Sequence, residues 1–259
     1  MDLGLRGRYA LVTASSAGLG YACAAQLAKA GATVVLNGRD GAALNGAAER
    51  LRADTKADVR VVAGDVSNAT VQEALVRAVP QVDILVNNNG GPPFRDFREV
   101  DRDALLAGVT ANMATPLELV QRVVDGMIER RFGRIVNITS FSVKMPIAGL
   151  DLSSGARAGL TGFLAGVARD VAHANVTINF LLPGYFATDR LRALHVREAQ
   201  ERGVPVESVA VQGAEGIPAR RFGHPDEFGA ACAFLCSEQA GYITGQSLLI
   251  DGGAYPGIL

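Results

Sequence analysis

The sequence is poor in two features that would place it in a special class of protein, cysteine and long apolar runs. Its three cysteines are Cys23, Cys232 and Cys236, an odd number without the Cys-x-x-Cys spacing of a zinc site. They predict neither a disulfide framework nor a bound metal, and we expect small buried side chains. No apolar run approaches the roughly 18 residues that a membrane-spanning helix needs, so no membrane partner is expected.

A charge excess of one sign is also lacking. The chain has 25 Lys and Arg against 26 Asp and Glu, a net charge of −1. This balance argues against a nucleic-acid partner, which would require a basic excess on one face. The N-terminus shows no basic-then-apolar signal pattern, so a cytoplasmic location is expected.

Short β-branched runs alternate along the chain with longer amphipathic stretches. Apolar residues fill most of each short run without alternation, which is typical of strands buried on both faces. The predicted strands are Tyr9–Thr13, Thr33–Asn37, Val59–Ala63, Ile84–Asn87, Arg134–Ile138, Val176–Leu181 and Ser247–Ile250.

Helix-period segments lie between these strands. The clearest are Leu19–Ala30, Ala42–Arg52, Pro116–Arg130 and Ala156–Ala172. Strands that alternate with helices predict an α/β fold, a doubly wound, seven-stranded parallel sheet with helices on both faces. No linker divides the chain, so residues 1–259 are interpreted as a single domain.

The segment 189–219 fits this alternation least well, because it carries many charged side chains. It follows the sixth predicted strand, where a doubly wound sheet would place a flap over the carboxyl ends of its strands. A helical flap that covers a substrate is one interpretation. A solvated helical hairpin is the other.

A glycine turn follows the first predicted strand directly. Thr13-Ala14-Ser15-Ser16-Ala17-Gly18-Leu19-Gly20 leads from that strand into a helix. Glycine lets the backbone approach a pyrophosphate closely, and a helix N-terminus offers free N–H groups. Ser15 and Ser16 would add hydroxyl donors. The pattern predicts a nucleotide site, with an ordinary strand–helix turn as the alternative.

The end of the second predicted strand indicates which nucleotide. A carboxylate there would bind the adenosine ribose and favour NAD, but the strand ends at Asn37-Gly38-Arg39. Arg39 is suited to a 2′-phosphate, so NADP is preferred over NAD. An exposed arginine with no ligand is the alternative.

Further short motifs follow the later strands. They are Asp65-Val66, Asn87-Asn88-Asn89-Gly90, Asn112, Ile138-Thr139-Ser140, Pro183-Gly184 and Thr188. In this order and spacing the chain, from about Gly7 to Gly253, resembles the short-chain dehydrogenase/reductase family. The resemblance is greatest to its β-ketoacyl-ACP reductase-like branch, and it implies a Rossmann fold.

The resemblance also implies residue roles. Asn112 would hold a water in a proton relay, and Ser140 would bind the substrate carbonyl. Asp65 and Val66 would flank the adenine, and Asn88 and Gly90 would line the ribose. At the nicotinamide end the implied contacts are Pro183, Gly184, Phe186 and Thr188.

The family's catalytic tyrosine and lysine are missing. Ser153 stands at the tyrosine position and Arg157 at the lysine position. An aliphatic hydroxyl is a much weaker acid than a phenol, whereas Arg157 keeps the positive charge and can donate to ribose hydroxyls.

Three residues are candidates for a replacement acid. Lys144, four residues past Ser140, is the first candidate, Tyr185 the second and His195 the third. The alternatives are that Lys144 is a solvated loop residue and that Tyr185 packs under the flap.

Two functions therefore stay open. One is an NADP-dependent oxidoreductase acting on a carbonyl/alcohol pair in a small molecule, with a 3-oxoacyl-like substrate as a candidate. The other is a nucleotide-binding pseudoenzyme with a regulatory or scaffolding role. The substrate pocket is expected at Gly91–Arg95, Val143–Leu150 and the segment 189–219. By resemblance to the family, the chain would form a homotetramer through Pro116–Arg130 and Ala156–Ala172.

Overall fold

Seven parallel strands form one sheet in the computed structural model, which describes residues 2–92 and 94–257. Their order is β3-β2-β1-β4-β5-β6-β7, and every neighbouring pair is parallel. The strands are β1 (Tyr9–Val12), β2 (Thr33–Gly38), β3 (Val59–Ala63), β4 (Ile84–Asn87), β5 (Gly133–Ile138), β6 (Val176–Pro183) and β7 (Ser247–Ile250). The predicted doubly wound sheet is confirmed, with strand ends that differ by at most two residues.

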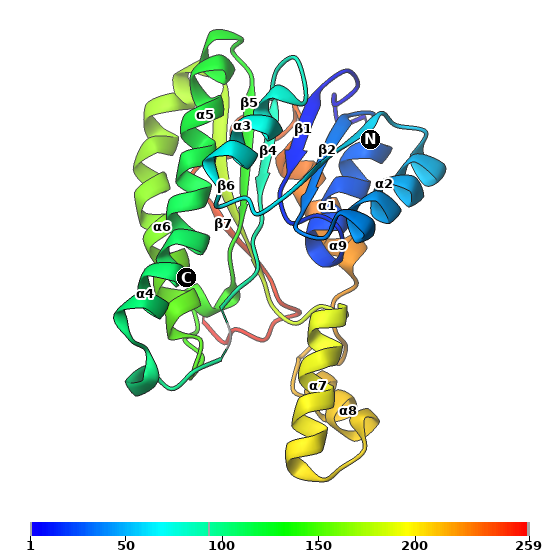
Figure 1. Ribbon diagram of the computed structural model, residues 1–259, viewed down its shortest axis with the longest axis vertical. Coiled ribbons are helices and arrows are strands. Elements are labelled where there is room, and N and C mark those ends of the chain that lie inside the picture. The colour runs from blue at the N-terminus through cyan, green and yellow to red at the C-terminus, as the bar shows by residue number, and fades with distance from the viewer. Residues whose placement is uncertain (1, 93, 258–259) are drawn as a thin grey trace.

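The helices lie on both faces of this sheet. They are α1 (Gly18–Lys29), α2 (Gly41–Thr55), α3 (Ala69–Arg77), α4 (Arg102–Val109), α5 (Thr115–Glu129), α6 (Asp151–Val171), α7 (Asp189–Arg202), α8 (Val206–Glu215) and α9 (Pro225–Leu235). Figure 1 shows α1, α2 and α9 on one side of the sheet and α5 and α6 on the other.

Helix α6 begins five residues before the predicted start at Ala156. The sequence Ser153-Ser154-Gly155 has low helix propensity, and this concealed the first turn. Asp151 lies in that turn, where its negative charge is favourable beside the helix N-terminus. The longer helix places Ser153 and Arg157 one turn apart on the same face.

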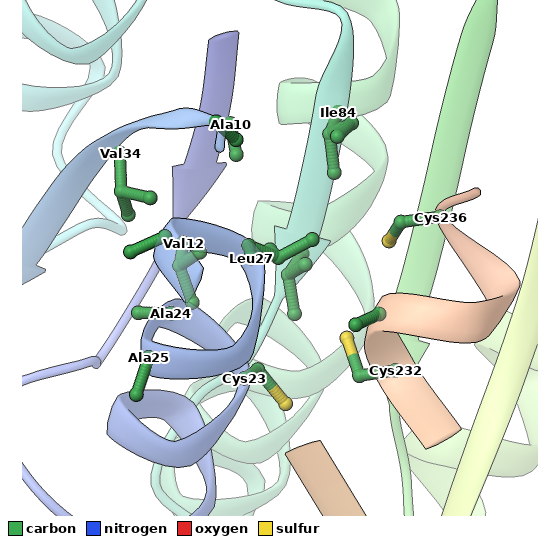
Figure 2. Packing of buried hydrophobic residues seen from close by; sticks show 14 of the residues in the cluster. Ala10, Val12, Cys23, Ala24, Ala25, Leu27, Val34, Ile84, Cys232 and Cys236 are labelled. Atoms are coloured by element: carbon green, nitrogen blue, oxygen red, sulfur yellow. The ribbon is translucent and has the colours of Figure 1, made fainter. Parts of the chain in front are cut away.

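Two apolar layers sandwich the sheet. Ala10 and Val12 of β1 pack into the layer under α1, α2 and α9, while Leu11 packs into the layer under α5 and α6. Figure 2 shows the first layer, where Cys23 from α1 lies near Cys232 of α9. All three cysteines are free and fully buried, as the sequence predicts.

The segment 189–219 forms a helical hairpin, α7 and α8. Figure 1 shows that the hairpin projects beyond the end of the sheet where β6 leads into α7. Thr188 caps the start of α7, since its hydroxyl accepts the Leu191 N–H at 3.4 Å. Few of its side chains are buried, chiefly Ala199 and Val209. Among the described residues, no helix is both long and apolar enough to cross a bilayer.

Candidate functional site

The glycine turn between β1 and α1 is held from within by hydroxyl groups. The Thr13 hydroxyl donates to the Asn88 carbonyl at 2.6 Å and accepts the Asn88 N–H at 2.8 Å. The buried Ser15 hydroxyl donates to the Val12 carbonyl at 2.7 Å, so its proton is used inside the turn. Ser16, by contrast, is partly exposed and lies beside Gly38.

The backbone of this turn is unusual. Ala14 stands where a first glycine was expected, and it adopts a left-handed conformation with φ of +44°. At Gly20 a Cβ atom would lie 2.5 Å from the Ala14 carbonyl oxygen and 2.7 Å from Asn88 Nδ2. A side chain there would therefore push apart the β1 and β4 ends.

The N-terminus of α1 has open N–H groups. Its cap residue is Ala17, which makes no side-chain hydrogen bond, and its first turn carries no acidic residue. The first N–H groups of a helix have no partner within the helix, and the helix dipole favours an anion there. Thus the residues present suit a phosphate group.

Two charged residues follow β2: Arg39, which is exposed, and Asp40, which is engaged as a helix cap. Arg39 is exposed, and its charge helps to lower the pKa of Asp65, after the larger effect of hydrogen bonds from Ser67. The Asp40 carboxylate caps α2 by accepting the N–H groups of Ala42 and Ala43 at 2.9 and 3.1 Å. Val66, beyond Asp65, is buried in the apolar layer.

The asparagines after β4 tie this strand to its neighbours. Asn87 Nδ2 donates to Asn137 Oδ1 at 2.9 Å, and Asn88 Nδ2 donates to the Ala14 carbonyl at 3.0 Å. Asn89 Nδ2 donates to the Ala111 carbonyl at 2.8 Å. Gly90 follows, and a Cβ atom there would meet nothing within 4 Å, so the loop borders open space.

A pocket of about 240 Å³ lies at the carboxyl ends of β4, β5 and β6. It brings together Ser140, Ser153, Arg157 and Tyr185 with residues of three expected cofactor-binding segments, whereas Arg39, Asp65 and Val66 are not among its described lining residues. The residues from those three segments are Leu19, Asn88, Pro183, Gly184, Phe186 and Thr188. Of the expected substrate segment Gly91–Arg95, Gly91 and Phe94 line the pocket, and Pro93 lies outside the described residues.

Ser140 is fixed by two donors. Its hydroxyl oxygen accepts the Ser142 N–H at 3.1 Å and the Ser142 hydroxyl at 2.9 Å. Ser154 Oγ donates in turn to Ser142 Oγ at 2.9 Å. Because both bonds occupy lone pairs of Ser140, the proton of that hydroxyl is free to point into the pocket.

Arg157 is a buried crosslink between strand ends. Its Nη1 donates to the Ile138 carbonyl at 2.7 Å, its Nη2 to the Asn89 carbonyl at 3.2 Å and its Nε to Ser153 Oγ at 3.1 Å. Burial, with a contribution from the charge of Arg190, lowers the pKa of Arg157 to about 10. The guanidinium is therefore charged at neutral pH.

Asn112 lies beside the pocket rather than in it. It belongs to a π-helical turn, Thr110–Ala114, and lines a neighbouring cavity of about 320 Å³. Its Nδ2 donates to the Gly108 carbonyl at 3.3 Å, while its buried Oδ1 has no partner among the described residues.

The three candidate acids occupy different places. Lys144 is not among the described residues that line the pocket, and its Nζ lies 6.0 Å from the Tyr255 ring centre. Tyr185 borders the pocket, and its ring meets Phe141 edge-on at 5.2 Å. His195 belongs to α7 of the flap itself and faces the neighbouring cavity, with its ring 5.2 Å from that of Phe222. Of the three candidates, Tyr185 is the one among the described residues that line the pocket.

Burial raises the pKa of Tyr185, so its phenol is protonated at neutral pH. Sequence reasoning missed that Ser142 bonds to Ser140 and that Ser154, 12 positions further on, bonds to Ser142. No spacing signal links residues 12 positions apart, because their contact depends on how α6 packs against the end of β5.

Comparison with known proteins agrees with this geometry. The family model described as enoyl-(acyl carrier protein) reductase matches residues 13–255. The chain belongs to the short-chain dehydrogenase/reductase family. An acetoacetyl-CoA reductase from Allochromatium vinosum is 34% identical over 96% of this chain and 98% of its own.

Two further relatives of this short-chain dehydrogenase/reductase cover nearly its whole length. A 3-oxoacyl-[acyl-carrier-protein] reductase from Vibrio cholerae is 34% identical over 98% of this chain and 99% of its own. The crystal structure of L-sorbose reductase from Gluconobacter frateurii, complexed with NADPH and L-sorbose, matches with a TM-score of 0.95. It is 29% identical and covers 100% of both chains.

Proposed function

We propose that this chain is an NADP-dependent oxidoreductase that interconverts a carbonyl group and an alcohol in a small molecule. The observation that carries the proposal is the Ser140 hydroxyl, held by two donors and open to a pocket beside the glycine turn. A hydroxyl in that state donates a hydrogen bond to a carbonyl oxygen and stabilises the negative charge that develops on it.

The residues present fit NADP. The uncapped start of α1 suits the phosphates, and Arg39 suits the 2′-phosphate, whereas Asp40 is engaged as a helix cap. The adenine and ribose would lie along Asp65, Val66, Asn88 and Gly90, with Phe186 and Thr188 at the nicotinamide. Bound NADPH supplies a hydride, and the NADPH complex of L-sorbose reductase supports this choice.

Ser153 and Arg157 would stand at the positions of the family's tyrosine and lysine. Arg157 keeps the positive charge, but three of its N–H groups hold Ser153 and two backbone carbonyls. Its role is therefore to fix the pocket wall and to supply positive charge, and the proton must come from another group.

A second function has one observation in its favour. The hydrogen bonds of Arg157 are all internal, and Ser153 offers no phenol, as a nucleotide-binding pseudoenzyme would allow. Against it stands the polarised Ser140, for which a pure binding module has no use. The three relatives named above are reductases, which favours the enzyme.

The names of two relatives also support a 3-oxoacyl-like substrate. A homotetramer in the cytoplasm, with contacts through α5 and α6, completes the proposal.

The test is a side-by-side titration with NADPH and NADH, read by cofactor fluorescence, followed by a screen of carbonyl compounds. Selective NADPH binding that Arg39→Ala weakens by about ten- to a hundredfold, with turnover of at least one carbonyl, would support the enzyme. NADPH binding without turnover across the screen would favour the pseudoenzyme. If neither nucleotide binds, both functions fail.

A further inference from the structure

The pocket beside Ser140 has positive charge and no described acidic side chain in its wall. Among its described lining residues are two arginines, Arg157 and Arg190, but neither Asp nor Glu. Arg157 is buried and bonded only to neutral groups, so its charge lacks an acidic partner among the described residues, whereas Arg190 is exposed at the pocket. An anionic ligand would restore the balance.

Arg190 reaches across the pocket from the first turn of α7. Its Nη2 and Nη1 lie 3.1 and 3.3 Å from the point where a Cβ atom on Gly91 would stand, and Ser153 Oγ lies 3.6 Å from the same point. Glycine at position 91 thus leaves room for the guanidinium beside Ser153. The positive charge of Arg190 also contributes, after burial, to the lowered pKa of Arg157.

Two flap arginines are paired with acids, whereas Arg190 in the pocket and Arg192 outside it are not paired with any described acid. Arg197 binds Glu201 at 2.7 Å, and Arg202 binds Glu198 at 2.6 Å, both within α7. Arg190 has no hydrogen bond or ion pair with any residue that the structure describes. Its planar fork is free to bind a carboxylate through two parallel hydrogen bonds.

We propose that Arg190 binds a carboxylate of the substrate close to the reacting carbonyl, so that the pocket selects oxo acids. This inference rests on the proposed oxidoreductase function. The diphosphate of the cofactor has its own site at the start of α1, which leaves Arg190 for the substrate.

The wall that the pocket shares with its neighbouring cavity is mainly apolar. A cavity of about 780 Å³ under the flap adjoins the pocket and shares five of its lining residues. These are Phe94, Ile147, Tyr185, Leu191 and Leu194. A carbonyl at Ser140 and a carboxylate at Arg190 would therefore leave room for a hydrocarbon chain beneath α7 and α8.

The test compares 3-oxohexanoate with its methyl ester, which removes the charge and keeps the carbonyl. The wild-type enzyme with NADPH should show a higher kcat/KM for the acid, and Arg190→Gln should lower it about ten- to a hundredfold for the acid alone. For Arg190→Lys, kcat/KM for the acid should lie between the values of the wild type and Arg190→Gln. Arg192→Gln, on the same helix and outside the pocket lining, is the matched control.

A second measurement does not depend on turnover. Hexanoate should bind the NADPH complex more tightly than hexanamide, and Arg190→Gln should abolish that difference. Equal binding of the two in the wild type, or an effect of Arg190→Gln on NADPH affinity alone, overturns the inference. Failure of the proposed function is distinguishable, because then NADPH itself does not bind or no carbonyl is reduced.

The serine cluster carries a second inference, drawn from a different observation but also resting on the proposed oxidoreductase function. Ser154 donates to Ser142, and Ser142 donates to Ser140, at 2.9 Å in each step. Ser142 is buried, whereas Ser154 is partly exposed. Once a substrate oxygen takes the Ser140 proton, the direction of the chain is fixed, because each hydroxyl has one proton to donate.

We infer that these three hydroxyls deliver the proton that the missing tyrosine would supply. As the substrate carbon receives its hydride, the Ser140 O–H bond breaks and an O–H bond forms on the product oxygen. Ser140 then takes the Ser142 proton, Ser142 takes the Ser154 proton, and Ser154 takes one from solvent water. Product and relay are all aliphatic alcohols, so no step is strongly uphill.

Removal of the middle hydroxyl tests this relay with little loss of geometry. In Ser142→Ala the backbone N–H of residue 142 still binds Ser140 Oγ, so Ser140 stays in place. We expect kcat to fall about a hundredfold with KM nearly unchanged, and the solvent deuterium isotope effect to change. Ser154→Ala should act in the same direction, and Ser154→Thr, which keeps a hydroxyl, should restore activity.

Tyr185→Phe distinguishes the rival acid. The relay predicts that this variant keeps its isotope effect and most of its kcat. The relay is overturned if Ser142→Ala and Ser154→Ala both keep the wild-type kcat and isotope effect, or if Tyr185→Phe alone abolishes turnover.

Discussion

The two polar regions at the carboxyl edge of the sheet use their side chains in opposite ways. In the glycine turn, the hydroxyls of Thr13 and Ser15 donate to backbone carbonyls. The face of the turn at the start of α1 therefore presents backbone N–H groups. Around β5 and α6, Ser140 keeps a free proton and Arg190 keeps a free charge.

The difference separates binding from chemistry. Backbone N–H groups at a helix start bind a phosphate whatever the neighbouring side chains are. Side chains with a free donor or an unpaired charge determine which substrate binds and how a proton moves. Such side chains can be replaced without a change of fold. In the proposed function the first region therefore holds the cofactor, and the second selects the substrate and moves the proton.

Loss of the Ser140 hydroxyl should produce the largest effect on kcat. It should impair the second region and leave the glycine turn intact. Ser140→Ala removes the donor to the substrate oxygen, and we expect kcat to fall about 10²- to 10³-fold, as when one donor to a developing oxyanion is removed. NADPH affinity, measured by fluorescence titration, should stay within about twofold. A loss of NADPH binding in this variant would mean that the two regions are not separable.

Arg157→Ala should affect the stability of both regions. It leaves the Ile138 and Asn89 carbonyls and Ser153 without their donor in a buried place. Each unpaired buried group costs about 1–3 kcal/mol, and part is recovered by water, so a loss of about 3 kcal/mol in unfolding free energy is expected. Urea titration of the apo protein measures it. Arg169→Ala, on the same helix and exposed, is the control.

Gly20→Ala breaks the first region. The added Cβ atom would collide with the Ala14 carbonyl and with Asn88 Nδ2, both of which help to shape the turn. We expect a loss of about 1–3 kcal/mol in stability, as for overpacking, and a clear loss of NADPH affinity. Gly46→Ala is the control, since a Cβ atom there meets only the flexible end of Arg50 at 3.7 Å. Unchanged NADPH affinity in Gly20→Ala would contradict the assignment of the turn.

The smallest effect concerns an exposed pair, Arg221 and Glu227, outside the described lining of the pocket. A hydrogen bond from Arg221, with one from the His224 N–H, lowers the pKa of Glu227 from 4.5 to about 2. A carboxylate with a lowered pKa stabilises the fold above its unfolded value, and that contribution disappears as pH falls toward about 2. Glu227→Gln should therefore lower Tm slightly at pH 7 and not at pH 2. A constant difference across that range would contradict the pairing.

The strands and the turn were predictable because they depend on local pattern. Unbroken apolar runs identify strands buried on both faces, and Gly18, Gly20 and Arg39 follow two of them at recognisable positions. The start of α6 was not predictable, since Ser153-Ser154-Gly155 favours a loop and is helical only in its packed setting. The position of Lys144 next to Tyr255 likewise depends on the C-terminal segment folding back.

The sequence by itself determined the sheet, its helices and the glycine turn. These features depend on hydrophobic periodicity and on backbone conformation, and both are set by residues close together in the sequence. Only the tertiary structure decided that Ser154 supports Ser142, that Arg157 crosslinks two strand ends and that Arg190 faces Gly91. Those contacts join segments distant along the chain. Hydroxyl and guanidinium groups interact only over a few ångströms, so their partners are fixed by packing and not by spacing.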